Sequence, residues 1–142
     1  MRKLTEKFTT FEDIYEKLCD MVELKRITPF VEVATVAAAV VTSDDEVFYG
    51  VNIKADCGMG FCAERNAMSS MLTLSKTKIK YILCVDRTKN LRLPCGACRE
   101  FVAQINPENM ETEILESVKP KKSVKLKKLL PSWWGHEKMN RK

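Results

Sequence analysis

The run VEVATVAAAVV at residues 31–41 constrains the fold most, because it consists of valine, alanine and threonine with a single charged residue. A strand of this composition, without alternating polar positions, is typical of a sheet that is covered on both faces. The following SDDE segment predicts a turn, and VFYGVNI at residues 47–53 predicts a second strand. We therefore expect an antiparallel hairpin inside a sheet that has helices on it.

The rest of the chain alternates between helical and strand-like patterns. Apolar periodicity predicts three helices, at residues 11–24, from residue 62 or 63 to about 74, and at residues 95–105. Thr10 is the expected N-cap of the first helix, and Pro29 closes it. Short apolar runs predict strands at residues 79–85 and 112–117, and residues 124–131 favour a short strand or a turn of helix. The order predicts an α/β fold, a three-layer α/β/α sandwich with a central mixed five-stranded sheet.

Length and charge limit the domain organisation. A chain of 142 residues with 45% hydrophobic content fits a single domain over residues 1–142, with a basic C-terminal tail from about residue 136. Because the sequence has neither a signal-like apolar region nor a membrane-length apolar run, we expect a cytoplasmic protein without a membrane partner. Residues 117–142 contain nine Lys or Arg and one acidic residue, typical of a solvated surface or, alternatively, of a patch for anions or nucleic acid.

The spacing of the cysteines indicates a metal site. Cys95 and Cys98 are one helical turn apart, a separation that suits two ligands of one tetrahedral zinc ion, and Cys62 can supply a third. Both CAER at residues 62–65 and PCGAC at residues 94–98 fall at predicted helix N-termini. Sites in α/β proteins collect where strands end and helices begin. We therefore expect one Zn²⁺ per chain.

The residues next to Cys62 indicate what such a metal site would do. Three thiolates on Zn²⁺ leave a net negative charge, which helix N-termini and the neighbouring Arg65 would offset. Three protein ligands leave the fourth position to water, whose pKa zinc lowers from 15.7 to roughly 7. Glu64, two residues from a ligand, is placed to move the proton of that water. The pattern predicts a catalytic centre.

Three other interpretations of the cysteines stay open. Cys57 could join the other three as the fourth ligand of a structural zinc site, which would exclude water. The CGAC segment could be a redox pair like that of thioredoxin, or Cys62 could pack in the core. Two further cysteines, Cys19 and Cys84, are expected in the core. The single histidine, His136, is expected away from the chemistry.

The two cysteine motifs together resemble a known family. CAERNA at residues 62–67 and PCGACRE at residues 94–100 resemble the zinc-site motifs of the cytidine deaminase family, H-x-E…P-C-x-x-C with a three-cysteine variant. The hairpin at residues 36–53 and LLPSWWG at residues 129–135 also resemble parts of that family. The resemblance covers roughly residues 31 to 135.

This resemblance implies a hydrolase that deaminates the cytosine of a free nucleoside to uracil and releases ammonia. In the family, a zinc-activated water attacks C4, and the carboxylate at Glu64 carries the proton to N3 and then to the leaving amino group. The resemblance implies that Cys62, Cys95 and Cys98 are the zinc ligands.

It also implies the contacts with the substrate: the Ala63 N–H binds the pyrimidine O2, the Leu93 carbonyl binds the amino group, and Asn52 binds the sugar. Finally, it implies a homotetramer in which Trp134, with Trp133 as a second candidate, covers a neighbouring subunit's site.

The sequence departs from the family pattern at the sugar end. Cytidine-type members carry Asn-x-Glu in the second strand, and this chain has Lys54 in place of the glutamate. Lys54 cannot accept a hydrogen bond from a ribose hydroxyl, although Asp56 could take that place after a loop shift. Ala34 stands where many members have an aromatic residue. Since blasticidin S deaminases share the loss of the glutamate, the substrate is either cytidine or deoxycytidine, or a cytosine nucleoside modified at the sugar.

Two further functions are the alternatives. The chain could be a catalytically idle relative with a structural zinc site and a basic tail that binds a partner or nucleic acid. Some relatives edit polynucleotides, but this chain has no inserted loops or interleaved aromatic residues to follow a strand. We therefore do not expect nucleic acid as the substrate.

Overall fold

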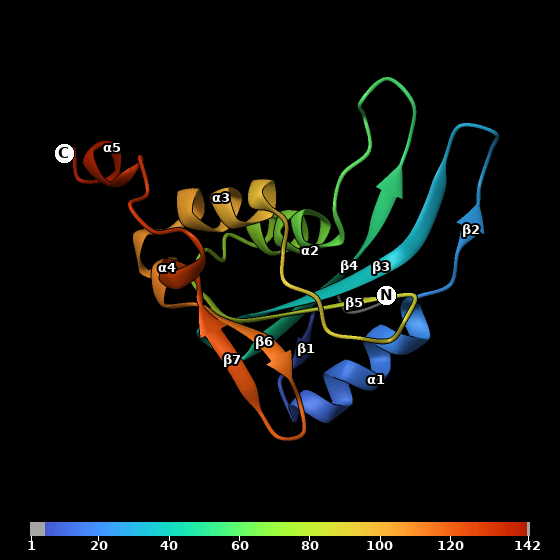
Figure 1. Cartoon of the computed structure of the whole chain (residues 1–142), viewed down its shortest axis with the longest axis horizontal. Helices are drawn as coiled ribbons and strands as arrows, with labels where there is room; N and C mark the ends of the chain where they lie inside the picture. Colours follow the sequence, from blue (N-terminus) through green and yellow to red (C-terminus); the bar gives the residue numbers. More distant parts are fainter. Residues whose placement is uncertain (1–4, 142) are drawn as a thin grey trace.

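A mixed sheet forms the centre of the molecule. The computed structural model describes residues 5–141. The strand order is β1-β4-β3-β5-β6-β7, with β2 paired to β3 (Figure 1). Neighbouring strands are antiparallel except β5 and β6, which are parallel. The strands are β1 Glu6–Lys7, β2 Lys25–Arg26, β3 Glu32–Thr42, β4 Glu46–Lys54, β5 Ile79–Asp86, β6 Glu113–Ser117 and β7 Lys122–Lys125.

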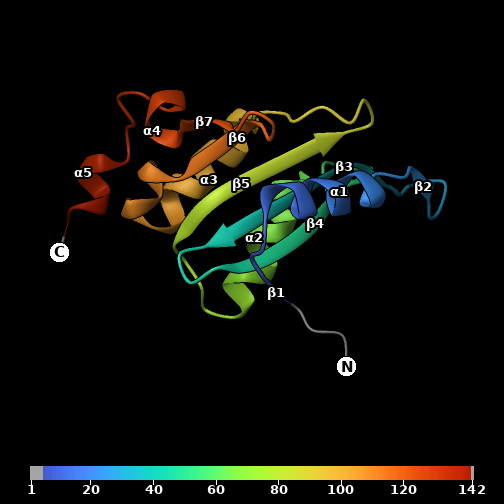
Figure 2. The same cartoon turned by 90° about the horizontal axis from the view of Figure 1, so that it is seen from below.

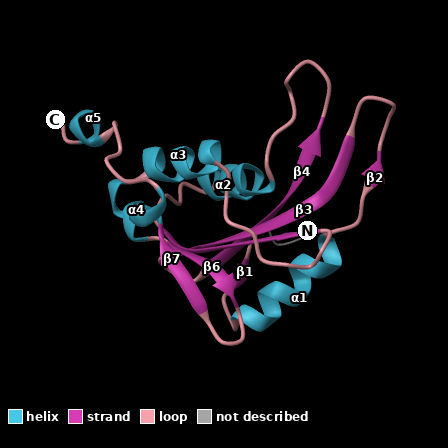
Figure 3. Cartoon of the chain, viewed as in Figure 1, coloured by secondary structure: helices cyan, strands magenta, loops and turns pink. Residues whose placement is uncertain are grey.

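Helices cover both faces of this sheet. Helix α1, Phe11–Met21, lies on one face, and α2, Ala63–Thr73, and α3, Gly96–Ile105, lie on the other (Figures 1 and 3). A view turned by 90° shows α1 across the strands on its own face (Figure 2). The remaining elements are the 3₁₀ helix η1 Pro107–Glu111, α4 Leu126–Leu129 and α5 His136–Met139. The predicted three-layer α/β/α class is confirmed.

The strand count is higher than the five predicted. The five longer strands, β3 to β7, are those that the sequence predicts, and residues 122–129 form both a short strand and a turn of helix. The two additional strands, β1 and β2, have two residues each. Such short segments carry no periodicity, so the sequence pattern misses them. Residues 1–4 and 142 of the predicted single domain lie outside the described residues.

Helix α1 begins as predicted and ends earlier. The Thr10 hydroxyl accepts the Asp13 N–H at 3.1 Å, which confirms the N-cap. The helix ends at Met21 rather than Leu24, whose side chain is 45% exposed. The helix ends early because of a tertiary contact: residues 25–26 pair with β3, so the chain leaves the helix and joins the sheet.

Each face of the sheet has its own core. On the α1 face, Ile14 and Leu18 pack with Ala37 and Leu83 of the central strands. On the other face, Phe48 and Val40 pack against α2 and α3 through the following residues: Ala67, Met68, Met71, Val102 and Ala103. The central strand β3 therefore contributes to both cores, as its continuous apolar sequence predicts. Within residues 5–141, no helix is both long and apolar enough to span a membrane.

Gly50 on β4 allows α2 to pack closely against the sheet. A Cβ at this position would lie 2.5 Å from the Ala67 backbone N and 2.7 Å from the Ala63 carbonyl O. Real Cβ atoms do not approach backbone this closely, so the distance between α2 and β4 requires glycine here. Because Ala63 begins α2, Gly50 also determines where the first turn of that helix lies.

Candidate active site and metal centre

Three cysteine thiols come together where α2 and α3 begin. Cys62 and Cys95 are the N-cap residues of these helices, and Cys98 lies in the first turn of α3. The Sγ atoms of Cys62 and Cys95 are 3.7 Å apart, those of Cys95 and Cys98 are 3.6 Å apart, and all three lie within 4.8 Å of one another. A tetrahedral zinc with Zn–S bonds of about 2.3 Å places its sulfur ligands roughly 3.8 Å apart. The cluster therefore has the donor atoms and the spacing for one zinc ion.

The surroundings of the cluster act on two of its thiols in opposite directions. Burial and the neighbouring Glu64 carboxylate raise the pKa of Cys98 above its ordinary value. Burial alone would raise the pKa of Cys95, but hydrogen bonds from the Cys98 and Ala97 backbone N–H groups and from neighbouring thiols lower it below its ordinary value. Arg65 Nη2 lies 4.0 Å from Cys62 Sγ, and this contact raises the pKa of the guanidinium. The structure thus places Arg65 next to Cys62, where its positive charge offsets thiolate charge.

Glu64 lies directly beside the sulfur cluster. Its side chain is 5% exposed, and its Oε2 is 3.5 Å from Cys98 Sγ. On the other side lies the buried thiol of Cys84, whose pKa burial and the Glu64 carboxylate raise above its ordinary value. A buried carboxylate without a cationic ion pair within the described structure is a candidate for proton transfer.

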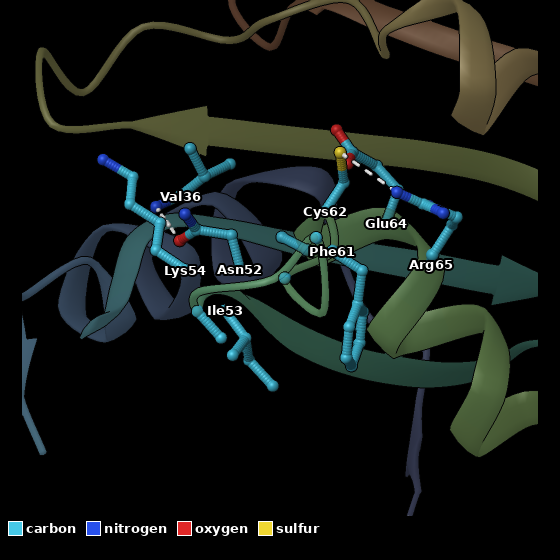
Figure 4. A pocket seen from close by; sticks show the side chains of 12 residues that line it. Val36, Asn52, Ile53, Lys54, Phe61, Cys62, Glu64 and Arg65 are labelled. Atoms are coloured by element: carbon cyan, nitrogen blue, oxygen red, sulfur yellow. Dashed lines mark hydrogen bonds between the residues drawn. The ribbon is translucent and has the colours of Figure 1, made fainter. Parts of the chain in front are cut away.

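A cavity of about 490 Å³ opens onto Glu64 and Cys62 (Figure 4). This volume lies within the usual range for small-molecule sites. Its wall is formed by Val36 of β3, the end of β4, the β4–α2 loop and the first residues of α2. The lining residues on β4 and beyond are Asn52, Ile53, Lys54, Ala55, Gly58, Gly60, Phe61, Cys62, Ala63, Glu64 and Arg65. The cavity therefore brings together Asn52 and the four predicted site residues at the start of α2, which are residues 62–65.

Asn52 shapes the cavity wall through β3. The pairing of β3 and β4 shifts register between Val33 and Ala37, and Ala34 there has a φ of 65°. Across this bulge, Asn52 Oδ1 accepts the Val36 N–H at 2.8 Å, and Nδ2 donates to Thr35 Oγ1 at 2.8 Å. Ala34 itself is buried and does not line the cavity. Val36, two residues further along β3, lines the cavity instead of Ala34.

Other predicted residues lie outside this cavity. Leu93 is exposed on the loop between β5 and α3. Trp134 is 65% exposed and borders a different hollow of about 410 Å³. Its neighbour Trp133 is buried and packs against the ring of His136, with ring centroids 5.4 Å apart. Cys57 is exposed and is not part of the three-sulfur cluster, so the alternative four-thiolate site is not formed.

The sequence predicted Cys84 in the core, but it did not predict the support that Cys84, Arg99 and Glu100 give to the site. Arg99 Nε donates to the Pro94 carbonyl at 2.8 Å and Nη1 to the Leu129 carbonyl at 3.3 Å, which holds the loop before Cys95. Glu100 binds both tryptophans, and Cys84 lies behind Glu64. Arg99 and Glu100 are adjacent and are the two charged residues of α3, which was an available signal.

Known proteins are similar to this chain in sequence and in fold. The family model described as "Cytidine and deoxycytidylate deaminase zinc-binding region" matches residues 14–113. A cytidine deaminase of Mycoplasma genitalium is 28% identical over 116 residues, which are 80% of this chain and 88% of the relative. One of Halalkalibacterium halodurans is 31% identical over 106 residues, 74% of this chain and 80% of the relative. The crystal structure of cytidine deaminase from Mycobacterium tuberculosis superposes with a TM-score of 0.70 at 21% identity, covering 89% of this chain and 99% of that one.

The fold and the three-sulfur cluster define a zinc-binding α/β protein. The match over residues 14–113 is more specific, and the chain belongs to the cytidine and deoxycytidylate deaminase family. The family match and the cluster confirm the prediction of a site for one zinc ion.

Proposed function

We propose that this protein is a hydrolytic deaminase that converts the cytosine of a free nucleoside to uracil and releases ammonia. The substrates in question are cytidine, deoxycytidine and cytosine nucleosides modified at the sugar, such as blasticidin S. The observation that carries the proposal is the position of Glu64, a buried carboxylate that lines a nucleoside-sized cavity 3.5 Å from one thiol of a three-cysteine cluster.

In this proposal, Cys62, Cys95 and Cys98 hold zinc, which when bound supplies a water activated for attack at neutral pH. Glu64 accepts a proton from the attacking water and delivers it to ring N3. It then takes the remaining proton from the hydroxyl group added at C4 and delivers it to the amino group, so that the C4–N bond breaks, the C4 carbonyl of uracil forms and ammonia leaves. Arg65 stabilises the thiolates and takes no proton.

The remaining roles concern the base and the sugar. The Ala63 N–H at the start of α2 is proposed to bind the pyrimidine O2, as an unpaired helix N-terminal donor can. The Leu93 carbonyl is proposed to accept a hydrogen bond from the amino group. Asn52 lines the cavity with one hydrogen bond at each amide atom, which leaves capacity at both atoms for a sugar hydroxyl.

The test is the Glu64→Gln variant, which removes the proposed general base and keeps the shape of the side chain. We expect wild-type levels of zinc by metal analysis and an unchanged circular dichroism spectrum. We also expect ammonia release from cytidine to fall at least about 10²-fold. Glu16→Gln, an exposed position on α1 at the opposite face, is the matched control and should keep full activity. A wild-type protein that binds one zinc and releases no ammonia from any cytosine nucleoside would instead be an idle relative.

We also propose that the chain assembles as a homotetramer in which Trp134 covers a neighbouring subunit's site. The support is that this side chain is 65% exposed and borders no part of its own chain's cavity. Light scattering after gel filtration should give four times the mass of the chain. Trp134→Ala should raise KM for cytidine if the indole reaches a neighbouring site, whereas a monomeric wild type would contradict the assembly.

A further inference from the structure

Lys54 is a cation in the wall of the candidate active-site cavity. It is the last residue of β4 and lines the cavity together with Asn52 and Ile53. Figure 4 shows Lys54 beside Asn52 and Val36, at the end of the cavity away from Glu64 and Arg65. If the cytosine ring of the substrate lies next to Glu64, this end of the cavity receives the sugar and its substituents.

Lys54 has no close ion-pair partner within the described structure. Lys54 makes no ion pair with residues 5–141 at 4.0 Å or less. Glu32 lies opposite it in the β3–β4 register. That carboxylate accepts two hydrogen bonds from Arg26, at 2.7 and 3.1 Å, and its pKa is lowered first by Arg26 and less by the more distant charge of Lys54. The Lys54 ammonium therefore has no close partner and can contact a ligand.

The other charged groups of the wall have partners in the catalytic cluster. Arg65 faces Cys62, and Glu64 faces Cys98. Asp56, which could have replaced a sugar-binding carboxylate, does not line the cavity. The sugar end thus offers an ammonium with three donors and no carboxylate as acceptor. Such an end suits an oxyanion better than a neutral ribose hydroxyl.

Resting on the proposed function, we infer that Lys54 makes the enzyme prefer cytosine nucleosides that carry an oxyanion on the sugar. A phosphate ester and a sugar carboxylate share this chemistry. Because Lys54 is exposed, the ion pair is partly screened, and we expect it to improve the use of an anionic substrate by roughly 2- to 5-fold.

The test uses the zinc-loaded enzyme and compares four compounds as its substrates. Ammonia release is measured with cytidine, cytidine 5′-monophosphate, cytidine 3′-monophosphate and blasticidin S, which carries a carboxylate on its sugar. We expect at least one anionic compound to exceed cytidine in kcat/KM, through a lower KM, and we expect added salt to reduce its advantage. The two phosphates and the carboxylate distinguish the source of the oxyanion.

Substitution of Lys54 gives the decisive comparison. Lys54→Gln should lower the ratio of kcat/KM for the preferred anion to that for cytidine by roughly 2- to 5-fold, and Lys54→Arg should retain most of the ratio. Lys128→Gln removes the same charge from the exposed side of α4 and should leave the ratio unchanged. An unchanged ratio in Lys54→Gln, or cytidine as the best substrate of the wild type, overturns the inference.

A second readout separates this inference from the proposed function. Calorimetry with zinc-loaded Glu64→Gln measures the affinity for the same four compounds without turnover. Tighter binding of an anion, lost in a Glu64→Gln Lys54→Gln double variant, supports the inference. Equal affinity for all four compounds overturns it. A wild type that releases ammonia from none of them contradicts the proposed function, whatever the affinities.

Discussion

Asn66 Nδ2 donates a hydrogen bond to the Val51 carbonyl O at 3.0 Å, which joins the first turns of α2 to β4 next to Gly50. Helix α2 carries Cys62 and Glu64 at its start, so its distance from β4 fixes where the sulfur cluster and the base lie. A change in this contact should therefore alter both stability and catalysis.

Gly50→Ala tests that relationship. The added Cβ would clash with the backbone of α2, and we expect the free energy of unfolding in urea to fall by about 1–3 kcal/mol. Ammonia release should fall as well, because the start of α2 is displaced. Gly96→Ala is the matched control, since nothing lies within 4 Å of its Cβ, and it should be as stable as the wild type. Equal stability of both variants would contradict close packing at Gly50.

Asn52→Ala should weaken both the fold and the cavity wall. The substitution leaves the Val36 N–H without its acceptor and Thr35 without its donor, and we expect a loss of about 1–3 kcal/mol in unfolding free energy. KM for a nucleoside should rise, because Val36 is part of the wall. Asn90→Ala removes an exposed amide that makes no side-chain hydrogen bond in the described structure. If both variants behave alike, Asn52 does not hold the bulge.

Zinc removal should change which thiols react with iodoacetamide. Cys95 is exposed, so we expect zinc to protect it and a chelator to make it reactive. Cys57 is exposed outside the cluster and should react in both conditions, whereas Cys84 is buried with a raised pKa and should react in neither. Mass spectrometry of the alkylated peptides gives the result. Rapid labelling of Cys95 in protein with one bound zinc would argue against its role as a ligand.

Asp44 should contribute to acid stability. In the folded protein, the pKa of its carboxyl is about 2, below the ordinary value of 3.8. The larger cause is a hydrogen bond from Lys76, and the smaller is a hydrogen bond from Thr42. A lowered pKa means stability that is present above about pH 4 and is lost as the pH falls toward 2. Asp44→Asn should therefore show a weaker fall of the urea midpoint between pH 4 and pH 2. Asp20→Asn, at an exposed position of α1, should follow the wild type.

Local patterns predicted the parts of this structure that depend on nearby residues. The start of α2 at Ala63, the hairpin turn at residues 43–46 and the helical spacing of Cys95 and Cys98 are all encoded within a few residues. The juxtaposition of Cys62 with this pair followed from the rule that sites gather at the ends of strands, together with the family resemblance.

The features that the sequence did not predict depend on distant partners. Helix α1 ends at Met21 because β2 pairs with β3. The bulge at Ala34 depends on an amide from the neighbouring strand, and a left-handed alanine has no signal of its own. Three further properties, a single domain over residues 1–142, a cytoplasmic location and a homotetramer, stay predictions.

The anchoring of the C-terminal segment has a spectroscopic consequence. The chain has two tryptophans, and the indole N–H groups of Trp133 and Trp134 both donate to the Glu100 carboxylate at 2.6 Å. Glu100 lies two residues after Cys98 on α3, so both indoles are attached to the helix that presents two of the three thiols. The tryptophan fluorescence of this protein therefore comes from one place, next to α3, and a displacement of that helix should change it.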